Sequence, residues 1–376
     1  MDVLNEFHRI VSSPHQFARN WKANTGGKVL GYLCTNLPEE LLYAAGVLPV
    51  RILGTNEPES VTGPYIWANT FCPFSRDCFA QALQGKYDYV DGISYGFCCL
   101  HARHVFESWK RHIPVQYSYE LCVPYLQSPH SKTFLTREME DYKNTLEKWT
   151  GNSISVDALD QAIDVYNKNR RLMSKIYDLM KADNPPLTEA EVAEIALSGM
   201  LIDKKEHNKL LEKALKEIPR RRSNSKHGPR IMLLGSVNNN IELIKFIDSL
   251  GAQVVIDDYC TGNRYYQTEV VPEENRLAAL AARETNRPPC PIKDIPERRR
   301  PVRYAKLIDD YRVQGAIYTI QKMCDAHGLD YPFIESALKA KNVPLLKLEL
   351  DLNIPTEQYR TRIEAFLEML ETSRMA

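Results

Sequence analysis

Short apolar runs alternate with stretches of helical periodicity in the first third of the chain. Apolar, β-compatible runs bounded by turn signals predict strands, whereas apolar residues spaced three and four apart predict helices. Gly46 and Pro73 mark helix limits, because glycine favours the position after a helix and proline its first turn. We expect strands at 28–35, 47–53, 89–95 and 113–119, and helices at 38–45, 73–84 and 100–111.

The middle of the chain carries helical patterns with no strand between them. Four helices are expected there, at 136–149, 156–180, 188–198 and 204–218. The polar, basic run 220–226 has no apolar period and is interpreted as an exposed linker. Alternation then resumes, interrupted by a long irregular segment after residue 257. Strands are expected at 230–235, 253–257, 315–320 and 343–348, with helices at 240–250, 301–311, 331–340 and 356–370.

Strands separated by helices of ten or more residues indicate βαβ units. The predicted fold class is therefore α/β, with two open parallel-sheet domains of the flavodoxin or Rossmann type and a helical connecting segment. Four parts are expected: an N-terminal helical segment at 1–27, a first α/β domain at 28–132, the helical segment with its basic linker at 133–225, and a second α/β domain at 226–376.

Charge and composition exclude several classes of protein. The 48 Lys and Arg residues balance 48 Asp and Glu residues, so no net charge attracts nucleic acid or an anionic membrane. No apolar run reaches the roughly 20 residues of a membrane span. The acidic residues Asp2 and Glu6 distinguish the N-terminus from a secretory signal. A cytoplasmic globular protein is expected.

The chain has nine cysteines, an odd number, and their spacing matches neither a disulfide framework nor a CxxC pair. Free thiols fit this pattern better than a disulfide scaffold, and a closed zinc site is not expected. Among them, Cys72 and Cys99 each directly precede a predicted helix, and Cys324 lies between a predicted strand and the next predicted helix. Helix N-termini stabilise a thiolate, so these three thiols would suit an iron–sulfur cluster.

Spacing alone leaves other interpretations open. Free cysteine is often a small buried hydrophobe, and Cys34, Cys78 and Cys98 lie close to the chosen three. Cys122, Cys260 and Cys290 are interpreted as structural. Charged residues lie at the same edge of the first predicted sheet. Glu39 and Glu40 are in the first turn of a predicted helix, where carboxylates interact favourably with the helix dipole. His101 and Arg103 are typical of a solvated or packed helix face.

Five separated stretches resemble the 2-hydroxyacyl-CoA dehydratase / benzoyl-CoA reductase family. The stretch 28–50 (KVLGY, PEEL, AAGVLPV) is similar to the opening of the family, and 235–266 is similar to a later segment. The stretch 71–78 (FCPFSRDC) resembles its first cluster motif. Residues 99–103 (CLHAR) resemble the second, and 324–332 (CDAH, DYP) the third.

The resemblance implies a cofactor and a ligand set. Cys72, Cys99 and Cys324 would each give one thiolate to a [4Fe-4S] cluster whose fourth iron is held by another ligand or by substrate. Cys78 is the rival for the first position. The chemistry implied is delivery of low-potential electrons to an acyl-CoA thioester, with protons supplied by a positioned acid. The first candidate for that acid is Glu40, as a carboxylate near the substrate, and the second is His101.

The resemblance also implies partners. The family works as a pair of related subunits fed by a separate ATP-hydrolysing electron activator, so a homologous, larger subunit is expected. This chain has no GxxxxGK[ST] motif and should receive electrons. With its FCPFSR motif and the stretch 167–171 (NKNRR), it resembles most the smaller cluster-bearing subunit of ATP-dependent benzoyl-CoA reductases. The alternatives are the β-type subunit of a 2-hydroxyacyl-CoA dehydratase, a homodimeric double-cubane reductase and a non-enzymatic electron-relay subunit.

Overall fold

The computed structural model describes residues 2–55, 63–221, 228–353 and 355–375. It contains two four-stranded sheets in which every pairing is parallel, as the sequence predicted. The first sheet has the order β2-β1-β3-β4 and the second β6-β5-β7-β8. The strands are β1 Val29–Tyr32, β2 Leu48–Arg51, β3 Gly92–Gly96, β4 Tyr117–Leu121, β5 Arg230–Gly235, β6 Gln253–Asp258, β7 Gly315–Gln321 and β8 Leu345–Leu350.

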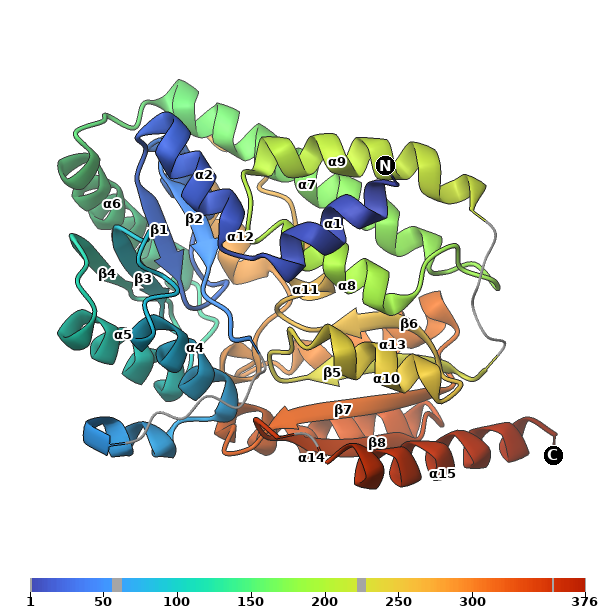
Figure 1. The fold of residues 1–376 in the computed structure, drawn as a ribbon. Helices are drawn as coiled ribbons and strands as arrows, with labels where there is room; N and C mark the ends of the chain where they lie inside the picture. Colours follow the sequence, from blue (N-terminus) through green and yellow to red (C-terminus); the bar gives the residue numbers. More distant parts are fainter. Residues whose placement is uncertain (1, 56–62, 222–227, 354, 376) are drawn as a thin grey trace.

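Helices cover both sheets and bridge them (Figure 1). Those after the strands of the first sheet are α3 Glu39–Ala44, α4 Pro73–Leu83 and α5 Leu100–His112, with the 3₁₀ segment η1 Gly63–Thr70. Those of the second sheet are α10 Ile241–Ser249, α11 Asn263–Tyr266, α12 Arg276–Asn286, η3 Pro291–Lys293, α13 Arg299–Tyr311, α14 Asp325–Ala340 and α15 Thr356–Met375. The remainder are α1 Val3–Ser12, α2 Gln16–Thr25, α6 Ser131–Thr150, α7 Val156–Leu179, α8 Glu189–Ser198, α9 Lys204–Glu217 and η2 Ile218–Arg220.

Local sequence explains where several helices begin and end. Pro73 occupies the first position of α4, where its missing N–H costs nothing. Gly46 follows α3 with a φ of 75°, a left-handed conformation that glycine adopts without strain. Thr188 and Glu191 form a complete capping box at the start of α8. These signals lie within one turn of the helix end, so they can be read from sequence.

Two expectations about the second half of the chain were wrong. The segment after residue 257, expected to be irregular, contains α12. Helix α14 begins at Asp325, six residues earlier than predicted, and continues through Pro332. The basic run 220–226, interpreted as a linker, lies outside the described residues from residue 222 onward.

Helix α12 joins the two halves of the molecule. Although it lies in the second half of the chain, it packs against α6, and its Ala279 and Leu280 belong to the same apolar cluster as Leu30 of β1. The predicted limits at 132 and 225 therefore divide the sequence at places where the packing is continuous. The limits themselves stay a prediction.

A buried ion cluster ties α11 and α13 to the end of β6. Asp258 is fully buried and contacts Arg264, Arg300 and Arg303, with the Arg303 Nε 2.8 Å from Asp258 Oδ1. Burial alone would raise the pKa of Asp258, but the three guanidinium groups hold it well below its usual range. The carboxylate therefore stays charged and fixes the loop that follows β6.

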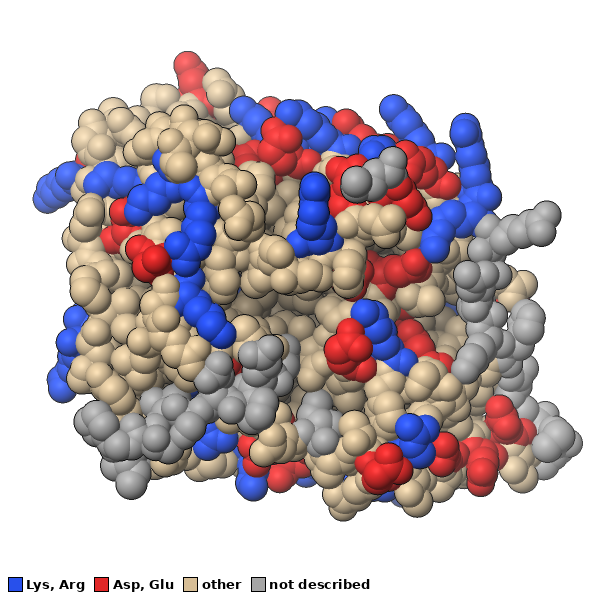
Figure 2. All heavy atoms as spheres, in the orientation of Figure 1, with Lys and Arg blue, Asp and Glu red and all other residues tan. Residues whose placement is uncertain are grey.

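The visible surface carries both signs of charge. Figure 2 shows Lys and Arg side chains interspersed with Asp and Glu side chains over the described residues of this face. In the part of the chain that the structure describes, no helix is both long and apolar enough to cross a membrane.

Candidate functional site

Both sheets place cysteines at their switch points. In the first sheet the chain passes from β1 to β2 on one side and then crosses to β3 on the other. In the second sheet it passes from β5 to β6 and then crosses to β7. The switch points therefore lie between β1 and β3 and between β5 and β7. Ligands bind in open parallel sheets at the carboxyl ends of the strands on either side of such a point. Cys34 follows β1, Cys98 and Cys99 follow β3, and Cys324 follows β7. In Figure 1 the arrowhead of β7 points toward the half of the molecule that holds the first sheet.

The three predicted ligands are all helix N-caps. Cys72 caps α4, Cys99 caps α5 and Cys324 caps α14, and none of these side chains bonds its own helix as a cap. The N–H groups of the first turn and the helix dipole therefore remain available to a negative group at each cysteine. Cys72 and Cys99 stand at helix starts that the sequence predicted, whereas Cys324 is an N-cap because α14 begins six residues earlier than expected.

The structure brings Cys72 and Cys324 together. Their thiols are close enough to interact electrostatically, and burial raises the pKa of Cys72 to about 11. Cys72 Sγ lies 3.3 Å from Ser75 Oγ, and the Cys324 thiol bonds Ser236 after β5. Metal-free thiols in this setting are protonated, and binding of a metal would release their protons.

His101 links Cys99 to Cys72. It is the second residue of α5, and its Nδ1 accepts a hydrogen bond from the Cys72 backbone N–H at 3.0 Å. An accepting Nδ1 cannot carry a proton, and burial lowers the pKa of His101. The ring is therefore neutral with its proton on Nε2. In this arrangement His101 positions the Cys72 loop, and the proton-donor role predicted for it stays a prediction.

Glu40 is buried in an ion pair. It is 1% exposed and contacts the guanidinium of Arg170, with Arg283 also within electrostatic reach. Burial alone would raise the pKa of Glu40, but the two arginines outweigh it and hold the pKa below its usual value. Glu40 is thus a permanent carboxylate. Its predicted place near the substrate stays a prediction.

A polar cluster beside Glu40 was not predicted. Glu39 Oε1 accepts a hydrogen bond from Tyr265 Oη at 2.6 Å, and Glu39 Oε2 lies 3.9 Å from Lys204 Nζ. Lys204 is 3% exposed, and burial lowers its pKa to about 8. A lysine with that pKa exchanges protons near neutral pH. Glu39 and Tyr265 are 226 positions apart in the sequence, so no local sequence pattern could have predicted this contact.

A tight approach between two loops shapes this edge of the first sheet. A Cβ on Gly96, the last residue of β3, would lie 2.2 Å from the carbonyl oxygen of Asn36 after β1. We expect Gly96→Ala to separate the loops that carry Cys34 and Cys99 and to cost about 1–3 kcal/mol of folding free energy. Urea unfolding of the metal-free chain measures this cost. Gly328→Ala is the control, because its nearest neighbour would be 3.8 Å away. There we expect a gain of about 0.5–1 kcal/mol from helix propensity.

The three thiols have the donor chemistry of an iron–sulfur ligand set. They stand at three helix N-termini, and those of Cys72 and Cys324 are close enough to interact electrostatically. Cysteine thiolates are the ligands that iron–sulfur clusters use.

Comparison with known protein families decides the wider identity. The model of the family described as "2-hydroxyglutaryl-CoA dehydratase, D-component" matches residues 34–370. The chain belongs to this family. The match covers every strand except β1, together with all three N-cap cysteines, and it confirms the resemblance found in the sequence.

Several curated members of the family are similar over nearly their whole length. The (R)-phenyllactyl-CoA dehydratase beta subunit of Clostridium sporogenes is 27% identical, with 98% of each chain covered. The beta subunit of the (R)-2-hydroxyglutaryl-CoA dehydratase of Acidaminococcus fermentans is 27% identical over 98% of this chain and 99% of that protein. A benzoyl-CoA reductase subunit of Thauera aromatica is 26% identical, with 88% of each chain covered. All three are named as subunits of acyl-CoA dehydratases or reductases.

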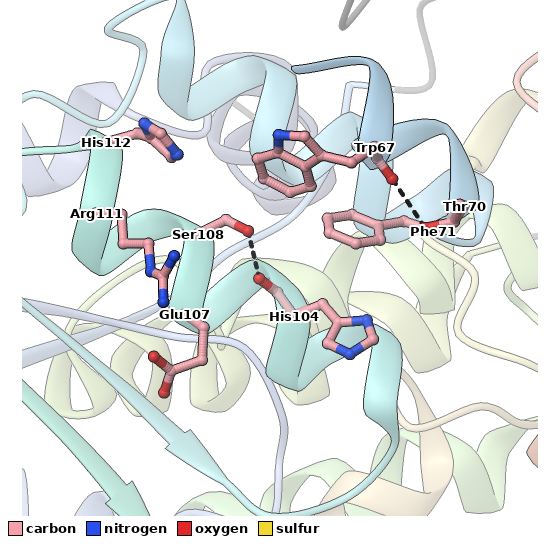
Figure 3. A pocket seen from close by; sticks show the side chains of 8 residues that line it. All are labelled: Trp67, Thr70, Phe71, His104, Glu107, Ser108, Arg111 and His112. Carbon is pink, nitrogen blue, oxygen red and sulfur yellow. Dashed lines mark hydrogen bonds between the residues drawn. The ribbon is translucent and has the colours of Figure 1, made fainter. Parts of the chain in front are cut away.

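Within this family fold, an aromatic cavity adjoins the first cysteine motif. It has a volume of about 460 Å³ and lies between η1 and the outer face of α5 (Figure 3). Phe71, directly before Cys72, stacks on His104 with ring centroids 5.7 Å apart, and Trp67 stacks on His112 at 6.0 Å. The motif residue Phe71 thus contributes to a surface pocket as well as to the start of α4.

Proposed function

We propose that this chain is the iron–sulfur β-type subunit of an acyl-CoA dehydratase of this family. The observation that carries the proposal is the placement of Cys72, Cys99 and Cys324 at three helix N-termini, two of which, those of Cys99 and Cys324, follow strands at the switch points of the two sheets. These residues would hold a [4Fe-4S] cluster, which when bound supplies single electrons of low potential to a CoA thioester.

The chain's own residues prepare the site for such a cofactor. His101 fixes the backbone at Cys72, and the N–H groups of the three first turns offset the negative charge of thiolates. The Glu40–Arg170 pair is a charged group with no free proton, whereas Lys204 has the pKa of a proton donor near neutral pH. We therefore favour Lys204 over Glu40 as the source of protons among these buried polar side chains.

The dehydratase assignment is preferred to the reductase predicted from sequence. The two dehydratase beta subunits align over 98% of this chain, whereas the benzoyl-CoA reductase subunit aligns over 88%. The benzoyl-CoA reductase subunit is the second candidate, supported by its 26% identity. In both cases we propose a homologous partner subunit and an ATP-hydrolysing activator, because the relatives are named as subunits.

Anaerobic purification tests the proposal. The protein is expected to be brown and oxygen-sensitive and to carry iron and acid-labile sulfide. With the co-purified partner, a family activator and ATP, it is expected to dehydrate a 2-hydroxyacyl-CoA. Reduction of benzoyl-CoA instead would select the second candidate. A chain that binds only zinc or no metal would refute both, and iron without affinity for any acyl-CoA would indicate an electron relay.

A further inference from the structure

The aromatic cavity beside the first cysteine motif has no part in the function proposed above. Its volume of about 460 Å³ is typical of sites that bind small molecules. Trp67 of η1 and Phe71 just after it form one side, and the outer face of α5 forms the other (Figure 3). On α5, His104, Ser108 and His112 are spaced four residues apart, so they lie on one face of the helix. Two separate segments therefore meet to form one binding surface.

The Trp67 ring is held in place by other rings and left partly uncovered. It contacts the rings of Tyr65, Phe71, Phe79 and His112, with centroids 5.5–6.3 Å apart. Although these neighbours surround it, Trp67 is still 37% exposed. Exposed aromatic rings in fixed positions are the surfaces on which proteins stack nucleobases. The Trp67 indole is therefore a preformed surface for a flat ring.

The polar groups around this ring favour a ligand that carries negative charge. The carboxylate of Glu107 is paired with Lys110, whose Nζ lies 3.3 Å from Glu107 Oε1. Arg111 is exposed and has no hydrogen-bond or ion-pair partner among the described residues. A free guanidinium can give two parallel hydrogen bonds to a phosphate. The ring nitrogens of His104 and His112 have no hydrogen-bond partner in the described part of the chain, so they can bond the edge of a heterocycle.

These features together limit the chemistry of the ligand. An aliphatic chain would leave the guanidinium of Arg111 and both imidazoles unused, and a simple inorganic anion would not use the face of Trp67. A nitrogen heterocycle that carries a phosphate uses all of them. CoA has such a group, a phosphorylated adenosine, at the end opposite its thiol.

We propose that this cavity binds the phosphorylated adenosine end of a CoA thioester. The inference rests on the proposed function, which supplies the thioester as substrate. The cavity ends at Phe71, the residue before Cys72, and its other wall is the helix that Cys99 caps. CoA would thus be anchored beside two of the proposed cofactor ligands, with its pantetheine arm carrying the thioester away from the adenosine. Free adenine nucleotides share the same recognition chemistry, and titration separates the two sources.

Isothermal titration calorimetry of the anaerobically purified protein tests the inference. CoA and adenosine 3′,5′-bisphosphate, which lacks the pantetheine arm, are both expected to bind. Pantetheine, which lacks the adenosine, is expected to bind at least about tenfold more weakly than CoA. Pantetheine that binds as tightly as CoA would overturn the adenosine site. AMP that binds as tightly as CoA would overturn the assignment to CoA and indicate a site for free nucleotides.

Substitutions in the cavity locate the binding. Trp67→Leu and Arg111→Met are each expected to weaken the binding of CoA about tenfold, because one removes the stacking face and the other the phosphate contact. Trp67→Phe keeps an aromatic face and should retain most of the affinity. Arg137→Met is the matched control, because Arg137 is an exposed arginine of α6 outside the cavity.

A second measurement needs no variant. Trp67 is the only exposed tryptophan among the described residues, so stacking of adenine on it should quench the fluorescence of the wild type. Unchanged fluorescence at saturating CoA would contradict the inference.

The outcomes separate this inference from the proposed function. A protein that holds iron and binds CoA equally well with and without the cavity substitutions would overturn the inference alone, because CoA would then bind elsewhere. Binding of CoA in the cavity by a protein that holds no iron would support the adenosine site and overturn the proposed function alone. A protein with neither iron nor affinity for CoA would overturn both.

Discussion

Replacing Cys72, Cys99 or Cys324 with serine is expected to remove the iron that these thiols hold and to abolish electron transfer. Cys72 and Cys324 are each the only cysteine at their helix N-terminus, whereas Cys98 directly precedes Cys99. A serine oxygen is a poorer ligand than thiolate for the iron of a sulfide cluster. Iron content and the electron paramagnetic resonance signal of the reduced, anaerobic protein measure the loss.

Cys78→Ser is the matched control for the first motif. Cys78 lies inside α4, fully buried in the apolar cluster of the first sheet, and its thiol points to the carbonyl of Ile52 at 4.0 Å. It therefore faces the core and not the start of the helix. The substitution should retain iron and cost about 1–3 kcal/mol of stability for a buried polar group. Loss of iron from Cys78→Ser but not from Cys72→Ser would transfer the first ligand to Cys78.

Arg170→Met is expected to destabilise the folded chain by about 3–5 kcal/mol at neutral pH, because it leaves the buried Glu40 carboxylate without its main partner. The double variant Glu40→Gln/Arg170→Met should recover most of that loss, since no uncompensated charge remains. Urea unfolding of the metal-free single and double variants measures both. Equal stabilities of wild type and Arg170→Met would contradict the importance of the pair.

The pH dependence of these variants has a definite sign. In the wild type the pKa of Glu40 is lowered in the folded state, so its contribution is present above the unfolded pKa and is lost as pH falls through the folded one. In Arg170→Met, burial remains as the main influence and raises the pKa. The variant should therefore recover stability relative to wild type as the pH falls through that raised pKa. A deficit that stays constant on acidification would argue against an unpaired carboxylate.

Local signals explain most of what the sequence predicted. Pro73, Gly46 and the alternating runs are features of a few neighbouring residues, and they located seven of the eight strands to within a few positions. Strand β4 was shifted, from 113–119 to Tyr117–Leu121. Helix α12 was missed because its apolar face is mostly alanine, which gives weak periodicity.

The site was predictable only where a side chain caps a helix. Cys72 and Cys99 each directly precede a helix that the sequence predicted, so their positions follow from local sequence, whereas the N-cap position of Cys324 was seen only in the structure. Lys204 acquires its meaning from Glu39, more than 150 positions away, through a contact that only the folded packing creates. Strand order, which sets these contacts, has no local signature.

The packing of α12 across the molecule means that the chain cannot be cut into two independent proteins. A fragment ending at Arg221 would contain the first sheet and α6 but would leave the apolar surface around Leu30 and α6 without Ala279 and Leu280. The complementary fragment would expose the other side of the same contact. Two such fragments would therefore need to associate with each other, because each would supply part of the apolar core that the other lacks.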